Sequence, residues 1–144
     1  KAKPNDLIAL SEKLAPIANA PANVIERLAQ DNEATIAGPV LAKSPALSDA
    51  TLTNIASNKG AGHLLAIASR ARIDEPMTDL LINRAGPDAA AVLHKIAGNE
   101  NARVSHVGFV KLINVAKRDQ KLAKLIAGRG DLPAELEPFL KLLG

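Results

Sequence analysis

The chain has 144 residues and a formal net charge of +3, and it contains no Cys, Trp or Tyr and only two aromatic residues, Phe109 and Phe139. A chain of this length can bury roughly 70% of its unfolded surface, so we expect one domain over residues 1–144 with a substantial core. The absence of cysteine excludes disulfides, zinc–thiolate sites, iron–sulfur clusters and cysteine nucleophiles. An aliphatic, aromatic-poor composition favours packed helices, because strands prefer aromatic and β-branched side chains.

The sequence also bears on the cellular location of the chain. No apolar run approaches the ~20 residues that a membrane-spanning helix needs, and the first residues, KAKPND, lack the hydrophobic segment of a signal peptide. We therefore predict no membrane span and a cytoplasmic location, with which the lack of cysteine is compatible. The chain begins at Lys1 rather than at methionine, and we expect it to be part of a longer polypeptide.

The predicted elements begin with a cap at about 6–19, continue with four repeat units, and end with a second cap at 133–143. Each unit contains two amphipathic stretches with apolar residues at helical spacing. A helical hairpin of this length cannot bury its apolar face alone, so neighbouring hairpins must stack. The predicted fold is therefore all-α, an α-solenoid of about four stacked hairpins with capping helices. The units span residues 21–49, 50–74, 75–104 and 105–131.

Two short motifs define the register of the repeat. The first stretch of each unit carries an aliphatic pair, and the second carries two small or aliphatic residues, a variable residue and a base. The pairs are Leu28-Ala29, Ile55-Ala56, Leu81-Ile82 and Val115-Ala116, and the second motifs are VLAK (40–43), IASR (67–70), VLHK (92–95) and IAGR (126–129).

Glycine and proline mark several positions along these stretches. Gly60-Ala61-Gly62 matches neither a dinucleotide fingerprint nor a Walker loop, so we interpret it as an interhelical turn, with anion binding at the following helix N-terminus as the less favoured alternative. Gly86-Pro87 predicts the end of one helix and the start of the next. Pro39 predicts a late helix start or a bend, and Gly108 a close approach by a neighbouring helix.

The segment from Ala34 to Pro133 contains IAGPVLAKSPALSD, HLLAIASR, RVSHVGFVKL and LIAGRGDLP. It resembles the domain of unknown function number 2336, a HEAT-like α-helical repeat family of alphaproteobacteria whose members commonly show a PVL–S–L–D block and an AIA–R block. The resemblance implies an α-solenoid. It brings no catalytic residue, because the family has no agreed activity.

The histidines do not form a recognisable catalytic or metal-binding pattern. His63, His94 and His106 are 31 and 12 residues apart, without an HExxH motif or a paired carboxylate, and no nucleophile elbow is present. We predict separate surface or core-edge roles for the three side chains, and no catalytic residue, metal or cofactor. An enzyme that uses His63 or His106 is the least favoured alternative.

The basic residues of the second motifs are Lys43, Arg70, Lys95 and Arg129, and we call these four the basic rail. The second helices of HEAT-like solenoids line a concave surface, so the leading hypothesis is a non-enzymatic scaffold or adaptor whose concave face binds an unknown protein partner or another domain of its own chain. Three further bases would lie at the margin of the rail: Arg84, Lys117 and Lys124. The structural alternative is that bases near helix C-termini complement the helix dipole.

A nucleic-acid interface over residues 103–129 is the functional alternative. Seven of the basic residues lie in this segment against Asp119 alone, a net charge of +6, whereas the rest of the chain has a net charge of −3. Proteins that bind single strands usually stack bases on aromatic side chains, and this chain has only two. Protein binding is therefore the preferred interpretation.

Overall fold

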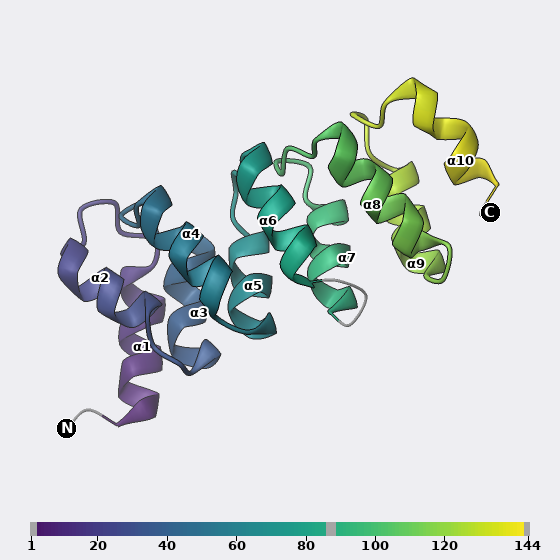
Figure 1. The fold of residues 1–144 in the computed structure, drawn as a ribbon. Coiled ribbons are helices and arrows are strands. Elements are labelled where there is room, and N and C mark those ends of the chain that lie inside the picture. The colour runs from purple at the N-terminus through teal and green to yellow at the C-terminus, as the bar shows by residue number, and fades with distance from the viewer. Residues whose placement is uncertain (1–2, 86–88, 143–144) are drawn as a thin grey trace. The chain divides into compact units, whose positions relative to one another are not determined.

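The computed structural model describes residues 3–85 and 89–142 and confirms the all-α prediction. The described residues form ten α-helices and one 3₁₀-helix, and their only β-type pairing is an isolated bridge between Ile73 and Ala102. The predicted turn at Gly86-Pro87 lies outside the described residues. The chain divides into two compact units, residues 1–71 and 72–144, and each is described by itself (Figure 1).

The first unit consists of two layers of helices. In one layer α1 and α5 pack on either side of α3, and in the other α2 packs on α3 and α4 packs on α5 (Figure 1). Most of the buried side chains are small or aliphatic, among them Ile25, Leu41 and Ile67. The helices are α1 (Pro4–Leu14), α2 (Ala22–Ala29), α3 (Ala34–Lys43), α4 (Asp49–Asn58) and α5 (Ala61–Ala68).

The second unit repeats this pairing and adds a C-terminal segment. Helices α6 and α7 form one pair and α8 and α9 the next, with α7 against α9 and α6 against α8, while α10 packs on α9. Its core includes Phe109, which is 1% exposed. The elements are α6 (Glu75–Ala85), α7 (Ala90–Gly98), α8 (His106–Ala116), α9 (Gln120–Ala127), the 3₁₀-helix η1 (Ala134–Leu136) and α10 (Glu137–Lys141).

A polar contact joins α4 to α2 in the first unit and α8 to α6 in the second. In the first unit the Ser48 hydroxyl caps α4 by accepting from the Thr51 N–H, and the Thr51 hydroxyl donates to Glu26 of α2 at 2.6 Å. In the second unit the Ser105 hydroxyl caps α8 and donates to Asp79 of α6 at 2.7 Å. The N-cap satisfies an otherwise unpaired N–H group, and the carboxylate fixes the neighbouring helix against it.

The burial pattern corrects the predicted register of the third and fourth units. The buried residues of α3 and α5 begin at Ile36 and His63, and those of α7 begin at Val92. This alignment places Asn99, not Lys95, at the position of Lys43 and Arg70, so Lys95 lies one helical turn earlier in its helix. In α8 the buried aliphatic pair after the N-cap is Leu112-Ile113 rather than Val115-Ala116. The matches of VLHK in α7 and of Val115-Ala116 in α8 are therefore displaced by about one turn.

Proline and glycine positions gave one wrong and one confirmed prediction. Helix α3 begins at Ala34 and continues through Pro39, so the late start is wrong and the bend is the alternative that stays a prediction. Gly108 is buried, and a Cβ built there would lie 3.1 Å from Asp79 Oδ1 of α6, which confirms the predicted close approach. Gly62 lies in the first turn of α5, where a Cβ would be 2.7 Å from the Cβ of Ala34. Its lack of a side chain allows α5 to approach the start of α3.

Candidate functional site

The Arg129 side chain of the basic rail is a buried structural element of the second unit. It is 3% exposed, and its guanidinium donates to carbonyl oxygens at the end of α7 and in the following loop. Its Nε and Nη2 also bind the Asp131 carboxylate at 2.8 and 2.9 Å, and its Cζ lies 5.7 Å from the centre of the Phe109 ring. The carbonyl acceptors are Ile96 at 3.0 Å, Ala97 at 3.1 Å, Asn99 at 2.9 Å and Ala102 at 2.6 Å.

Arg70 makes the corresponding contact in the first unit. Its Nη1 donates to the Leu41 carbonyl at 2.7 Å and its Nη2 to the Ser44 carbonyl at 2.8 Å, at the C-terminal end of α3. Burial lowers the pKa of Arg70, and the charge of Asp49 opposes this shift. Arg70 follows α5 and donates to carbonyl groups at the end of α3, and Arg129 follows α9 and donates to carbonyl groups at the end of α7. We call these two residues the arginine clamps.

The structure assigns the other predicted contact residues to exposed positions. Lys43 is exposed at the end of α3, and Lys95 is exposed on α7, outside the register of the clamps. The three margin residues, Arg84 on α6, Lys117 after α8 and Lys124 on α9, are exposed as well. Two of the four rail residues therefore direct their charge into the fold, and the rail is not a uniform row of surface charges.

The three histidines lie in separate places, and each has its own partner. His63 is a buried residue in the first turn of α5, and its Nε2 is 2.8 Å from the Asp31 carbonyl. The His94 Nε2 lies 2.6 Å from Asp119 Oδ2. In the part of the chain that the structure describes, no group of three or more His, Cys, Asp or Glu residues could hold a metal ion.

Asp119 is both the N-cap of α9 and the partner of His94. Its Oδ1 accepts from the Leu122 N–H at 3.1 Å, while its other oxygen faces the imidazole. The hydrogen bond from Leu122 is the largest cause of a lowered Asp119 pKa; burial opposes the shift, and His94 adds to it. The hydrogen bond between Asp119 and His94 joins α7 to the start of α9.

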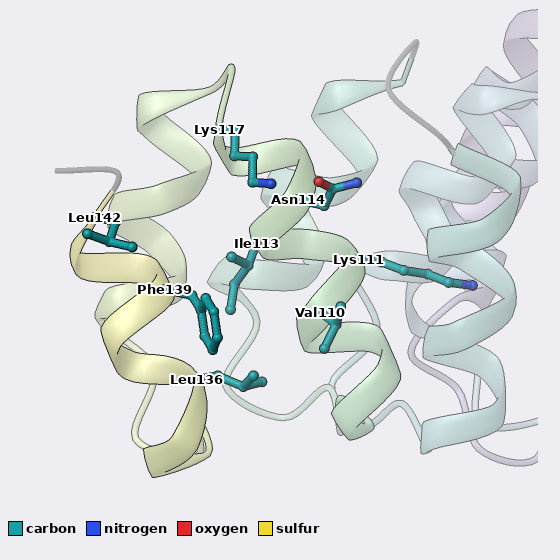
Figure 2. A pocket seen from close by; sticks show the side chains of 8 residues that line it. All are labelled: Val110, Lys111, Ile113, Asn114, Lys117, Leu136, Phe139 and Leu142. Carbon is teal, nitrogen blue, oxygen red and sulfur yellow. The ribbon is translucent and has the colours of Figure 1, made fainter.

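An apolar groove lies between α8 and the C-terminal segment of the second unit (Figure 2). It has a volume of about 510 Å³ and is lined by side chains of α8, the residue that follows it, η1 and α10. Phe139, Ile113 and Leu136 point toward one another across it, with Val110 and Lys117 at opposite ends of the α8 wall. The lining residues are Val110, Lys111, Ile113, Asn114, Lys117, Leu136, Phe139 and Leu142.

Exposed apolar side chains and basic groups distinguish this groove. Phe139 is 57% exposed and Val110 is 45% exposed, although side chains of this type usually bury most of their surface. The charged lining residues are both lysines, Lys111 and Lys117. Lys111 donates to the Asn83 side chain of α6, whereas the Lys117 side chain makes no hydrogen bond or ion pair with another described residue.

A second cleft of about 510 Å³ lies on the α9 side of the same segment. Its lining includes Glu137 and therefore mixes acidic and basic groups, and its apolar members Leu132 and Leu140 are half-buried or buried. The α8 groove thus combines the more exposed apolar side chains with charge of a single sign. We define it as the candidate functional site.

Sequence reasoning identified one member of this site, Lys117, and missed the rest. The apolar members come from α8 and from residues 133–143, which were interpreted only as a cap. The available signal was the short run LEPFLKLL, where apolar residues outnumber what one packed face of a single short helix can use.

Comparison with known proteins supports the resemblance of Ala34–Pro133. A family model described as an uncharacterised protein conserved in bacteria, DUF2336, matches residues 36–137. No curated protein and no solved structure matches the chain. None of the described helices is long and apolar enough to cross a membrane. The matched segment extends from α3 into the C-terminal segment and includes most of the chain, and the protein therefore belongs to the bacterial DUF2336 family.

Proposed function

We propose that this domain is a cytoplasmic, non-enzymatic protein-binding module with a HEAT-like arrangement of helical hairpins, and that the α8 groove is its contact site. The observation that carries the proposal is the exposure of Phe139 and Val110 in a groove of about 510 Å³. Contiguous exposed apolar surface favours association with a partner, because covering it removes it from water. Among the described residues, the closest histidine–carboxylate contact, His94 with Asp119, is part of the N-cap of α9 and lies outside the groove.

The proposal leaves all four residues of the basic rail outside the contact site. Arg129 is buried and Arg70 is bonded to two carbonyls, so their side chains serve the hairpins rather than a partner. Lys117 remains a contact residue because it lines the groove. Lys43 and Lys95, on α3 and α7, are outside the proposed contact site.

A photo-crosslinking amino acid at Asn114, inside the groove, tests this function in the bacterium from which the chain derives. The matched control places the same group at Asn54, an exposed asparagine of α4 in the first unit. A protein that crosslinks from Asn114 and not from Asn54 should lose binding when Phe139→Glu puts a charge in the groove, and keep it when Val107→Glu is introduced. Val107 is 59% exposed on α8, the helix that also carries Asn114, but it does not line the groove.

Equal effects of Phe139→Glu and Val107→Glu, or crosslinks with the same proteins from both positions, would count against the groove as the contact site. Circular dichroism of each variant checks that its helices are intact.

Nucleic-acid binding remains a second candidate because four basic side chains are exposed around the α8–α9 turn: Lys117, Arg118, Lys121 and Lys124. Such a cluster predicts binding that weakens steeply with salt, since each neutralised phosphate releases counterions. Fluorescence anisotropy with labelled single- and double-stranded oligonucleotides at about 50 mM salt tests it. The absence of a signal change at micromolar protein would eliminate this candidate.

A further inference from the structure

The α8 wall of the groove is a regular helical stripe. Val110, Ile113, Asn114 and Lys117 lie at positions i, i+3, i+4 and i+7, a separation that spans about 10 Å along a helix axis. Leu136 and Phe139 form the opposite wall from η1 and α10 (Figure 2). The groove therefore has the length of about two helical turns, which matches the apolar stripe of a short helix laid into it.

The described residues around the groove offer no sheet edge to which a strand could be added, because their one β-type pairing, Ile73 with Ala102, is an isolated bridge. An extended peptide would leave backbone N–H and C=O groups facing apolar side chains without partners, and this is costly. A helix satisfies those groups internally and presents only side chains. The walls of the groove thus favour a helical occupant over an extended one.

The charge of the groove selects among helical occupants. The two charged lining residues are Lys111 on α8 and Lys117 directly after it, and no acidic residue lines the groove. Lys111 extends away from Phe139 to donate to Asn83 of α6, so Lys117 supplies the charge at the groove (Figure 2). The nearest carboxylates in sequence flank Leu136: Glu135 lies 3.4 Å from His106, and Glu137 lines the cleft on the other side of α10. The α8 rim therefore presents uncompensated positive charge beside an apolar floor.

From this geometry we propose that the groove binds an amphipathic helix of a partner protein, with two or three apolar anchors on one face and Asp or Glu residues beside them. This inference rests on the proposed protein-binding function and specifies the chemistry of the partner. The anchors fill the space between Ile113 and Phe139, and the carboxylates lie against Lys117 and the α8 rim. Apolar contact supplies most of the affinity, and Lys117 selects acidic over basic helices.

Selection from a library of displayed, helix-stabilised 14-residue peptides tests the proposal. The library varies the anchor positions over apolar residues and the flanking positions over Asp, Glu, Lys, Gln and Ala, and the purified chain is the target. We expect enrichment of Leu, Ile, Phe or Met at i, i+3 or i+4, and i+7, together with acidic flanks. Nuclear magnetic resonance should then place the largest shift changes at Ile113, Asn114 and Phe139.

Matched variants separate the contribution of the rim from general electrostatics. Lys117→Glu should weaken an enriched acidic peptide about tenfold and favour the same peptide with basic flanks, because attraction is replaced by repulsion. Lys121→Glu is the control for net charge, since Lys121 is exposed and does not line the groove. It should change the affinity less than twofold at about 150 mM salt, at which exposed charges beyond ~8 Å are screened.

Failure of this inference can be distinguished from failure of the proposed function. Enrichment of basic or neutral flanks, equal effects of Lys117→Glu and Lys121→Glu, or no enriched peptide would overturn the acidic-helix proposal. Crosslinking from Asn114 tests the protein-binding function separately. If sedimentation instead shows self-association that Phe139→Glu abolishes, the occupant is a second copy of the chain. If only a fatty acid shifts the resonances of the groove residues, the occupant is an amphiphile. Either result also overturns the proposal.

Discussion

Removal of the Arg129 clamp should destabilise the second unit far more than removal of an exposed base. Arg129→Ala removes a donor from four carbonyls of α7 and the following loop, and it also removes the partner of Asp131. The carbonyls of Ile96 and Asn99 keep a backbone N–H donor, whereas those of Ala97 and Ala102 lose their donor. An unsatisfied buried polar group costs about 1–3 kcal/mol, although water will reach some of these carbonyls after the truncation. Because such costs are not additive, we expect a loss of about 3–5 kcal/mol in the free energy of unfolding.

Two further substitutions test the reasoning behind that magnitude. Arg129→Lys retains the charge but lacks the planar fork that serves several acceptors, so it should recover less than half of the loss. Arg118→Ala removes an exposed base from the same unit and should change stability by no more than about 0.5 kcal/mol.

Urea unfolding followed by circular dichroism at 222 nm measures these differences. If the two units unfold separately, only the transition of the second unit should move to lower denaturant. A change below 1 kcal/mol for Arg129→Ala, or full rescue by lysine, would refute the argument that the fork of hydrogen bonds, rather than the charge alone, stabilises the fold.

Three other predictions follow from local contacts. Gly62→Ala should destabilise the first unit by about 1–3 kcal/mol in urea unfolding, because its Cβ would overlap the start of α3, whereas an unchanged midpoint would show that the helices can separate at no cost. Ser11→Ala should leave the melting temperature unchanged or raise it, because the buried hydroxyl has no partner among the described residues; a fall of several degrees would indicate a hidden hydrogen bond. The Leu122 N–H and, to a lesser extent, His94 lower the Asp119 pKa, so its ionised form stabilises the native state above the unfolded pKa of about 3.9 and this contribution is lost as the pH falls through the lower native value. The stability difference between the wild type and Asp119→Asn should therefore shrink as the pH falls below about 4, and a difference that stays constant on acidification would contradict the assignment.

The sequence predicted the helical class because its apolar residues recur at helical spacing, in stretches that polar or breaking residues separate. It predicted the register less well. In VLHK the residues Val92 and Leu93 are buried in the same way as Ile96 and Ala97 one turn later, so a motif of four residues matches either turn. Only the burial pattern of the whole helix distinguishes the two.

The roles of the bases were harder to predict than their positions. A base after the last turn of a helix suggests complementation of that helix's own dipole, and dipole complementation was the alternative to the rail. In the structure Arg70 instead reaches the carbonyl end of α3, and Arg129 reaches the carbonyl end of α7, 26–33 residues away in sequence. The α8 groove was missed for the same reason, since Ile113 and Phe139 come together only through the packing of α10 on α9.

The arginine clamps have a consequence for synthesis on the ribosome. The carbonyls of Leu41 near the end of α3 and of Ala97 near the end of α7 obtain their donors only when Arg70 and Arg129 have been added, a full hairpin later. A nascent chain that ends before either arginine exposes an unfinished helix end, and folding domains generally consolidate from the N-terminus as they emerge. Each hairpin is thus completed by its successor, and a truncation between α7 and Arg129 should yield a frayed product rather than a shorter native domain.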